Sequence, residues 1–154
     1  NRMKKLLSCI FFLFIFGCAG YEPVFLTKDL NFYINKIENI DDEEITKKII
    51  RNIGSYKLDR KKINYSLEIS SKNTNEITSR DSKGDPRTYR ITIEVKIDVF
   101  KEGQASLFNT INIKKDFTYN YQVNQFDLSQ YKKDIIQNLT SKISEEMILK
   151  LQLM

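Results

Sequence analysis

Apolar and polar residues alternate most clearly in the middle of the chain, from Tyr89 to Val99. Every second residue of this stretch is apolar, and the residues between them carry hydroxyl groups and charges of both signs. Successive side chains of a strand point to opposite faces of a sheet, so a strand of this pattern has one buried face and one polar face. The pattern therefore predicts a one-sided sheet.

Three other segments alternate in the same way and are expected to be strands, at residues 30–34, 63–69 and 107–121. In the last of these, the apolar face is expected to carry Leu107, Ile111, Ile113, Phe117, Tyr119 and Tyr121. The polar stretch 70–86 fits an extension of the second strand that runs into a loop. Residues 101–104 fit a hairpin turn, because Gly103 tolerates the positive φ that such turns require.

Two segments have the spacing of amphipathic helices. The first repeats isoleucine every four residues after an acidic run, with Asp41 or Asp42 as the expected cap and Gly54 as the C-terminal stop. We interpret the acidic run as a helix start that complements the helix dipole, in preference to a catalytic carboxylate pair. The second helix is long, with Asp127 or Ser129 as its expected cap and apolar residues continuing to Leu151.

The expected order of elements is thus β-α-β-β-β-α. The first helix is a crossover between two parallel strands, and the next three strands can form an antiparallel meander. We predict an α+β fold, a two-layer sandwich whose four-stranded, mostly antiparallel sheet is covered on one face by two helices. The other face of the sheet is expected to stay polar.

Composition argues against an enzyme. The 154 residues suffice for one domain, and they include no histidine, so the commonest general base and the imidazole metal sites are excluded. The five glycines do not cluster into a phosphate-binding loop. A hydrolase using a Ser-Lys pair is a weak alternative, because Ser71-Lys72 and Ser141-Lys142 are adjacent in sequence and adjacent side chains point in different directions. We expect no catalytic residue, no metal and no dissociable cofactor.

The net charge of +5 does not indicate nucleic-acid binding. Arg2, Lys4 and Lys5 account for three of these charges, which leaves +2 for the rest of the chain. These residues precede an apolar run of about eleven residues, which at about 1.5 Å per residue is too short to span a bilayer. We expect residues 1–17 to be a signal peptide of the lipoprotein type that starts at Met3.

The end of this run, Ile15-Phe16-Gly17-Cys18, resembles the lipobox of bacterial lipoproteins. The resemblance implies that Cys18 carries a diacylglycerol and an N-acyl chain such as palmitate, which together give stable anchoring. Residues 18–29 would then be a lipidated tether, and residues 30–154 the α+β sandwich domain. Cys9 would leave with the signal peptide. The alternative is that Cys18 is an ordinary apolar residue that ends the run.

The chain also resembles the LPS-assembly lipoprotein family, LptE. The resemblance rests on a glycine, an aromatic, a variable residue, a proline, an aliphatic and an aromatic shortly after the cysteine, and on three later features. These residues are Gly20 to Phe25, the stretch Arg87 to Ile91, the hairpin Gly103, and the aromatic strand Phe117 to Tyr121 before a long helix. Ala19 stands between Cys18 and Gly20, where many members have Cys-Gly directly.

This resemblance implies a non-enzymatic lipoprotein of the outer membrane, facing the periplasm and lying largely within a barrel lumen. Its implied partners are an LptD-type outer-membrane β-barrel, which it plugs and helps to assemble, lipopolysaccharide, and the membrane that holds its lipid anchor. No nucleic acid is implied. The alternative is an auxiliary lipoprotein of an envelope lipid transporter of the ABC type.

Phosphate groups of lipopolysaccharide would be bound by arginine or lysine. Six basic residues are candidate contacts to the lipid or to the barrel, since we expect them on the loop and the polar face of the central strands. They are Arg80, Lys83, Arg87, Arg90, Lys114 and Lys115. The alternative for each is a solvated surface cation without a ligand. Tyr21, Pro23 and Phe25 are expected to pack on the domain, and the alternative is that they contact the barrel.

Overall fold

The computed structural model describes residues 30–41, 43–54, 63–121 and 124–154. The predicted signal peptide, Cys18, the predicted tether and Asp42 lie outside these residues. The described elements follow the predicted order β-α-β-β-β-α. They are β1 (Phe32–Asn39), α2 (Glu44–Ile53), β2 (Ile63–Arg80), β3 (Pro86–Lys101), β4 (Leu107–Asn120) and α3 (Gln125–Gln152).

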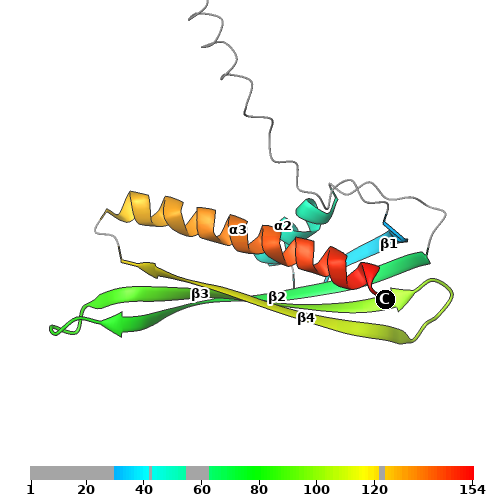
Figure 1. Cartoon of the computed structure of the whole chain (residues 1–154), viewed down its shortest axis with the longest axis horizontal. Coiled ribbons are helices and arrows are strands. Elements are labelled where there is room, and N and C mark those ends of the chain that lie inside the picture. The colour runs from blue at the N-terminus through cyan, green and yellow to red at the C-terminus, as the bar shows by residue number, and fades with distance from the viewer. Residues whose placement is uncertain (1–29, 42, 55–62, 122–123) are drawn as a thin grey trace, which may run out of the picture.

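The four strands form one sheet in the order β1-β2-β3-β4. β1 is parallel to β2, and the other two pairings are antiparallel. The helix α2 therefore connects two parallel neighbours, as predicted for a crossover. Both helices lie on the same side of the sheet in Figure 1. The predicted two-layer α+β sandwich is confirmed.

The core lies between the sheet and the two helices. β3 supplies its centre with Ile91, Ile93, Val95, Ile97 and Val99, which are all buried as the alternation predicted. The helices meet this layer with Ile45, Ile49 and Ile53 of α2 and with Leu139, Ile143 and Met147 of α3. Burial of each such side chain contributes about 1.5–3 kcal/mol, so this one-sided pattern is the main source of the fold's stability.

The start of α2 differs from the prediction. The capping position is Glu43, whose side chain makes no capping hydrogen bond. The Asp41 carboxylate instead accepts hydrogen bonds from the Glu43 N–H at 3.1 Å and from the Ser71 N–H on β2. Partial burial raises the pKa of Asp41, but these hydrogen bonds outweigh it and hold the pKa below its ordinary value. Asp41 therefore joins the start of α2 to the edge of β2.

The end of α2 also differs in detail. Gly54 follows Ile53 with φ −59°, so it ends the helix in a right-handed conformation that any residue can adopt. Its N–H still donates to the Ile50 carbonyl at 3.0 Å. By contrast, Gly103 in the turn between β3 and β4 has φ +81°, as the sequence predicted.

The long helix begins earlier than expected. Asn124 is its N-cap, and the Asn124 side chain accepts a hydrogen bond from the Phe126 N–H at 3.0 Å. Asp127 and Ser129 were therefore wrong as caps, and both lie inside α3. Asp127 keeps a favourable position because a carboxylate in the first turn interacts well with the helix dipole.

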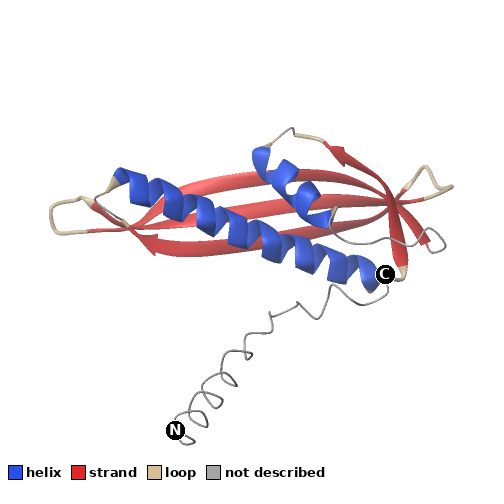
Figure 2. Cartoon of the chain, turned by 90° about the horizontal axis from the view of Figure 1, so that it is seen from above, coloured by secondary structure: helices blue, strands red, loops and turns tan. Residues whose placement is uncertain are grey.

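The two helices cover the sheet unequally. Figure 2 shows α3 crossing the sheet over most of its length, whereas α2 lies beside only one half of α3. Of the six residues expected to form the buried side of β4, Ile111, Ile113 and Tyr119 are buried. Leu107, Phe117 and Tyr121 are 53%, 43% and 41% exposed, because β4 is an edge strand and a single helix lies over it. No helix within the described residues is long and apolar enough to cross a membrane.

Candidate interaction surface

The face of the sheet that points away from the helices is polar, as predicted, and is called the open face here. It is formed by every second residue of β2, β3 and β4, and in Figure 1 no described helix or strand covers it. Its charged residues are Glu68, Lys72, Glu76, Arg90, Glu94, Lys96, Asp98, Lys114 and Asp116. Four cations stand beside five anions on these three strands, so the surface is strongly polar but nearly neutral.

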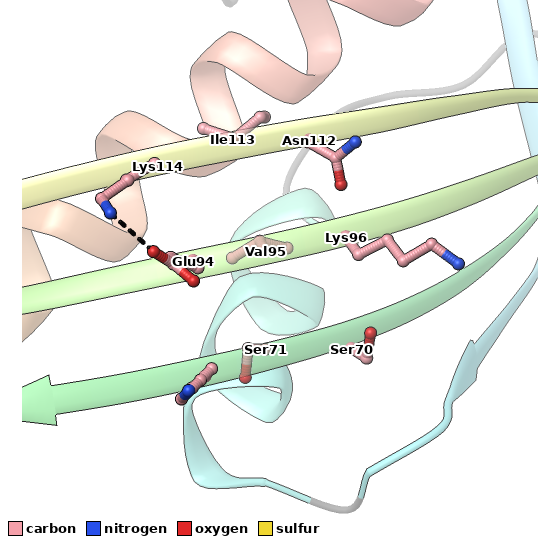
Figure 3. Close-up of a pocket in the computed structure, with 9 residues that line it drawn as sticks. Ser70, Ser71, Glu94, Val95, Lys96, Asn112, Ile113 and Lys114 are labelled. Atoms are coloured by element: carbon pink, nitrogen blue, oxygen red, sulfur yellow. Dashed lines mark hydrogen bonds and ion pairs between the residues drawn. The ribbon is translucent and has the colours of Figure 1, made fainter.

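Most of these charges are paired on the sheet itself. The Lys114 ammonium lies 2.7 Å from a Glu94 carboxylate oxygen on the neighbouring strand, as Figure 3 shows. Hydrogen bonding between them lowers the pKa of Glu94 and raises the pKa of Lys114. Lys96 pairs with Asp98 at 2.6 Å. Such exposed pairs add little stability, but they fix where hydrogen-bonding groups lie.

Two hollows lie on the open face among the residues that the structure describes. The larger hollow has a volume of about 450 Å³ and lies between the middle of β2 and the middle of β4, with Lys96 and Asn112 at one end and Lys114 at the other (Figure 3). The smaller has a volume of about 250 Å³ and lies nearer Arg90 and Asp116. Both are shallow, and most of the residues that line them are polar.

A basic region lies at the hairpin between β2 and β3, which we call the tip and define as residues 79–88. Arg80, Lys83 and Arg87 all lie there and are exposed. None of the three has an acidic partner within 4 Å among the described residues. Arg80 and Arg87 line a hollow of about 490 Å³ together with Ser79, Pro86, Thr88, Asn120 and Tyr121. The tip thus gathers three of the six predicted basic contacts.

The tip loop is held by its own hydrogen bonds. The Asp81 carboxylate accepts from the Lys83 N–H at 2.8 Å and from the Asp85 N–H at 2.9 Å. The Arg80 guanidinium donates to the Gly84 carbonyl at 2.8 Å, which leaves its other N–H groups for a ligand. Gly84 has φ +89°, a conformation that glycine adopts without strain.

The other three candidates are placed differently. Arg90 lies 3.9 Å from Asp116 on the open face, and Lys114 is paired with Glu94 as described above. Lys115 was wrongly assigned to the polar face. It has the parity of the buried residues Ile111 and Ile113 and forms an ion pair with Glu146 of α3 at 2.5 Å. Lys115 therefore joins the two layers and is not a free contact.

A cluster of four tyrosines near the tip was missed in the sequence. Tyr89 stacks on Tyr119 with ring centroids 5.6 Å apart, Tyr121 lies 6.3 Å from Tyr89, and the Tyr131 ring on α3 meets Tyr119 edge-on at 6.1 Å. The alternating aromatic residues Phe117, Tyr119 and Tyr121 could have indicated this cluster from the sequence. Tyr119 also donates to the Asn75 side chain at 3.2 Å, so the cluster stiffens the end of the sheet that carries the basic tip.

The Ser-Lys pairing is not assembled on β2. The Ser71 hydroxyl lies under α2, 2.7 Å from the Thr46 hydroxyl. Lys72 lies on the open face, where it borders both hollows. The two residues thus point to opposite sides of the sheet, and this geometry gives no support to a hydrolase.

Together these features define a small two-layer α+β protein with a charge-balanced sheet face and a basic tip. The family model LptE, described as lipopolysaccharide-assembly, matches residues 31–151. The chain belongs to the LptE family. No curated protein matches the sequence significantly. The family match gives no support to the transporter-lipoprotein alternative.

Solved structures share this fold at low sequence identity. Rare lipoprotein B from Shewanella oneidensis is 13% identical with a TM-score of 0.57, over 77% of this chain and 94% of that one. A putative lipoprotein from Caulobacter crescentus is 10% identical with a TM-score of 0.55, over 76% and 88% of the two chains. Lipoprotein B from Nitrosomonas europaea is 10% identical with a TM-score of 0.56, over 86% and 90%.

Proposed function

We propose that the protein is an outer-membrane lipoprotein that plugs and supports the assembly of an LptD-type β-barrel and assists delivery of lipopolysaccharide to the cell surface. Membership of the lipopolysaccharide-assembly family supports the process. The observation that carries the plug role is the open face, whose cations and anions are arranged in pairs on an uncovered sheet.

A wide barrel has a polar, hydrated interior. A protein that fills it must keep its apolar core covered and present hydrogen-bonding groups to the wall, because an unpaired buried polar group is costly. In this chain the helices cover the apolar side of the sheet. The open face supplies hydrogen-bond donors and acceptors on both cationic and anionic side chains. Such a surface can contact a mixed polar wall without leaving a large net charge unbalanced.

The tip is the proposed contact for lipopolysaccharide. Its phosphates need charge-assisted hydrogen bonds, and guanidinium groups provide them in a bidentate geometry. Arg80, Lys83 and Arg87 have no acidic partner among the described residues, whereas Arg90, Lys114 and Lys115 each lie beside a carboxylate. The three tip residues are therefore better placed to bind a phosphate than the other three.

The anchor in this proposal is Cys18, which carries the covalent diacylglycerol and N-acyl chain. Two or more acyl chains hold a protein stably at a membrane, whereas one chain is marginal. Residues 19–29 would then connect the lipid to the domain. The role needs neither a catalytic residue nor a metal.

Purification of the tagged protein from membranes in mild detergent tests this function. Mass spectrometry of the co-purifying proteins should recover a large outer-membrane β-barrel at near one-to-one ratio. Recovery of inner-membrane transporter subunits in its place would contradict the proposal. So would the absence of any barrel under conditions in which other envelope complexes stay intact.

A further inference from the structure

Exposed aromatic side chains surround the buried centre of the tyrosine cluster. Tyr119 is buried, whereas Phe117, Tyr121 and Tyr131 are exposed. Phe117 and Tyr121 each lie two residues from Tyr119 on β4, so the three side chains share one face of the strand. The Tyr131 ring on α3 meets Tyr119 edge-on. We call these four residues the aromatic strip, which follows the junction between α3 and the edge strand β4.

The aromatic strip begins at the basic hollow of the tip. Tyr121 lines this hollow of about 490 Å³ together with Arg80 and Arg87. The Tyr121 N–H donates to the Arg87 carbonyl at 2.8 Å, so these two residues lie opposite each other on neighbouring strands. Opposite residues of an antiparallel pair place their side chains on the same face of the sheet. Arg87 is therefore on the same side of the sheet as the aromatic strip.

The far end of the aromatic strip meets an ion pair. Lys115 lies two residues before Phe117 on the same face of β4 and pairs with Glu146 of α3. From Tyr121 to Phe117 the strand covers about 14 Å at about 3.4 Å per residue. The region thus has a cationic end, an aromatic middle of limited length and a charged stop.

These parts match the chemistry of one class of ligand. Guanidinium groups bind a phosphate through charge-assisted hydrogen bonds. A tyrosine ring has an apolar body and a polar tip, which suits the boundary between a lipid headgroup and its hydrocarbon. Exposed apolar side chains beyond that boundary are stabilised when hydrocarbon covers them. A lipid with a phosphate headgroup uses the whole region, whereas a free phosphate uses only the cationic end.

A bilayer surface fits this region less well than a single lipid molecule. The aromatic strip runs from the tip along the side of the domain and ends beside Lys115 and Glu146. A flat bilayer that touched both the tip and Phe117 would also approach this ion pair. Removing a charged pair from water costs free energy, so contact with one acyl chain along the strip is favoured.

We propose that the basic hollow and the aromatic strip form one site for a single molecule of a phosphate-bearing lipid. The phosphate binds to Arg80 and Arg87, and an acyl chain lies along Tyr121 and Phe117. This site rests on the proposed function, which assigns the tip to lipid phosphate, and adds the contact with the acyl chain. Because each buried methylene contributes to the affinity, the chain and the headgroup both determine binding.

Isothermal titration of the full chain with Cys18→Ser tests the site in detergent-free buffer. This substitution removes the acyl chains that the protein itself is proposed to carry, which would compete for the aromatic strip. The probes are dihexanoyl phosphatidic acid, kept below its critical micelle concentration, and glycerol phosphate, which lacks the acyl chains. Phosphatidic acid should bind at least about tenfold more tightly than glycerol phosphate, because only its chains reach the strip.

Substitutions separate the two parts of the site. Phe117→Ser and Tyr131→Ser, on different elements, should each weaken binding of phosphatidic acid by about fivefold and leave glycerol phosphate unchanged. Arg87→Ser should weaken binding of both probes. The matched control is Leu107→Ser, which removes an exposed apolar side chain at the other end of β4 and should change neither affinity. Circular dichroism of each variant verifies that it is folded.

Three outcomes would overturn the proposal. The first is equal affinity for the two probes, and the second is a loss with Leu107→Ser as large as with Phe117→Ser and Tyr131→Ser. The third is flotation with phosphatidylglycerol vesicles by a protein that binds no monomeric phosphatidic acid, which would assign the tip to a bilayer surface. Recovery of a β-barrel from membranes does not depend on these titrations, so either result can fail without the other.

Discussion

The ammonium group of Lys115 on β4 lies 2.5 Å from the carboxylate of Glu146 on α3, and this ion pair joins the sheet to the helix layer. Lys150, one turn further along α3, approaches the same carboxylate at 3.1 Å. Both partners of the first pair are about two-thirds removed from solvent, so the interaction is less screened than the pairs on the open face.

Glu146→Gln should destabilise the fold by about 1 kcal/mol at neutral pH, because Lys115 loses its charged partner in a half-buried site. Hydrogen bonding from Lys115, and then from Lys150, lowers the pKa of Glu146 below its ordinary value near 4.5. A carboxyl group with a lowered folded-state pKa stabilises the fold above its unfolded pKa and loses this effect as the pH falls through the folded value.

Urea unfolding at several pH values measures this effect. The difference between wild type and Glu146→Gln should be constant above about pH 5 and should shrink on acidification. The control is Glu145→Gln, an exposed neighbour with no ion pair among the described residues, which should stay within about 0.5 kcal/mol of wild type. A difference that grows toward acid pH would contradict the assignment.

Gly103 in the β3–β4 hairpin and Gly54 at the end of α2 provide a second, matched prediction. Gly103→Ala forces a side chain into φ +81° and should cost about 1 kcal/mol, although nothing crowds the new methyl group. Gly54 has φ −59°, and a methyl group there would make ordinary contacts. Gly54→Ala should therefore be neutral, or should stabilise the fold by about 0.5 kcal/mol because alanine lowers the conformational entropy of the unfolded chain. Thermal unfolding of the two variants measures both, and equal effects would show that backbone conformation is not the cause.

Cys18→Ser should abolish acylation, because the acylated atom is the thiol sulfur. Intact mass and membrane fractionation after expression in a host that processes lipoproteins measure this outcome. Cys9→Ser should keep the lipid-bearing mass, since we expect Cys9 to lie in the removed segment. An unchanged mass for Cys18→Ser would refute the proposed anchor.

Arg87→Ser should weaken binding of purified lipopolysaccharide by about tenfold, the loss of roughly one charge-assisted hydrogen bond. The control, Lys142→Ser, removes an exposed cation of α3 at a distance from the tip and should have little effect. Binding of a fluorescent lipopolysaccharide, titrated at fixed salt, distinguishes the two. Equal weakening by both variants would indicate attraction by net charge and contradict a site at the tip.

The sequence predicted the parts of the fold that repeat regularly. The alternation from Tyr89 to Val99 predicted the central strand, and the isoleucines of α2 and α3 predicted two helices on one side, because burial on one face imposes that period. Helix caps were less predictable. Asn124, Asp127 and Ser129 are all good capping residues, and only tertiary packing decides which of them begins α3.

The candidate site was partly predictable. Arg80, Lys83 and Arg87 are at the tip as expected, since a polar loop lay between two strands. Lys115 was assigned to the polar face because it is charged, although its position in the alternation of β4 points it toward the helices. Glu146 on α3 provides the partner that allows a lysine there. The acid that pairs with each cation is distant in sequence, so the contrast between the paired residues and the tip required the structure.

The most direct test of the central claim is site-specific photocrosslinking in living cells. A photoreactive side chain at Thr92, in the middle of the open face, should form an adduct with an outer-membrane β-barrel. The same group at Lys142, on the solvent side of α3, is the comparison for contacts made by the helix layer. A barrel adduct from Thr92 is the predicted result. No barrel adduct from any open-face position, with the protein expressed and folded, would contradict the account.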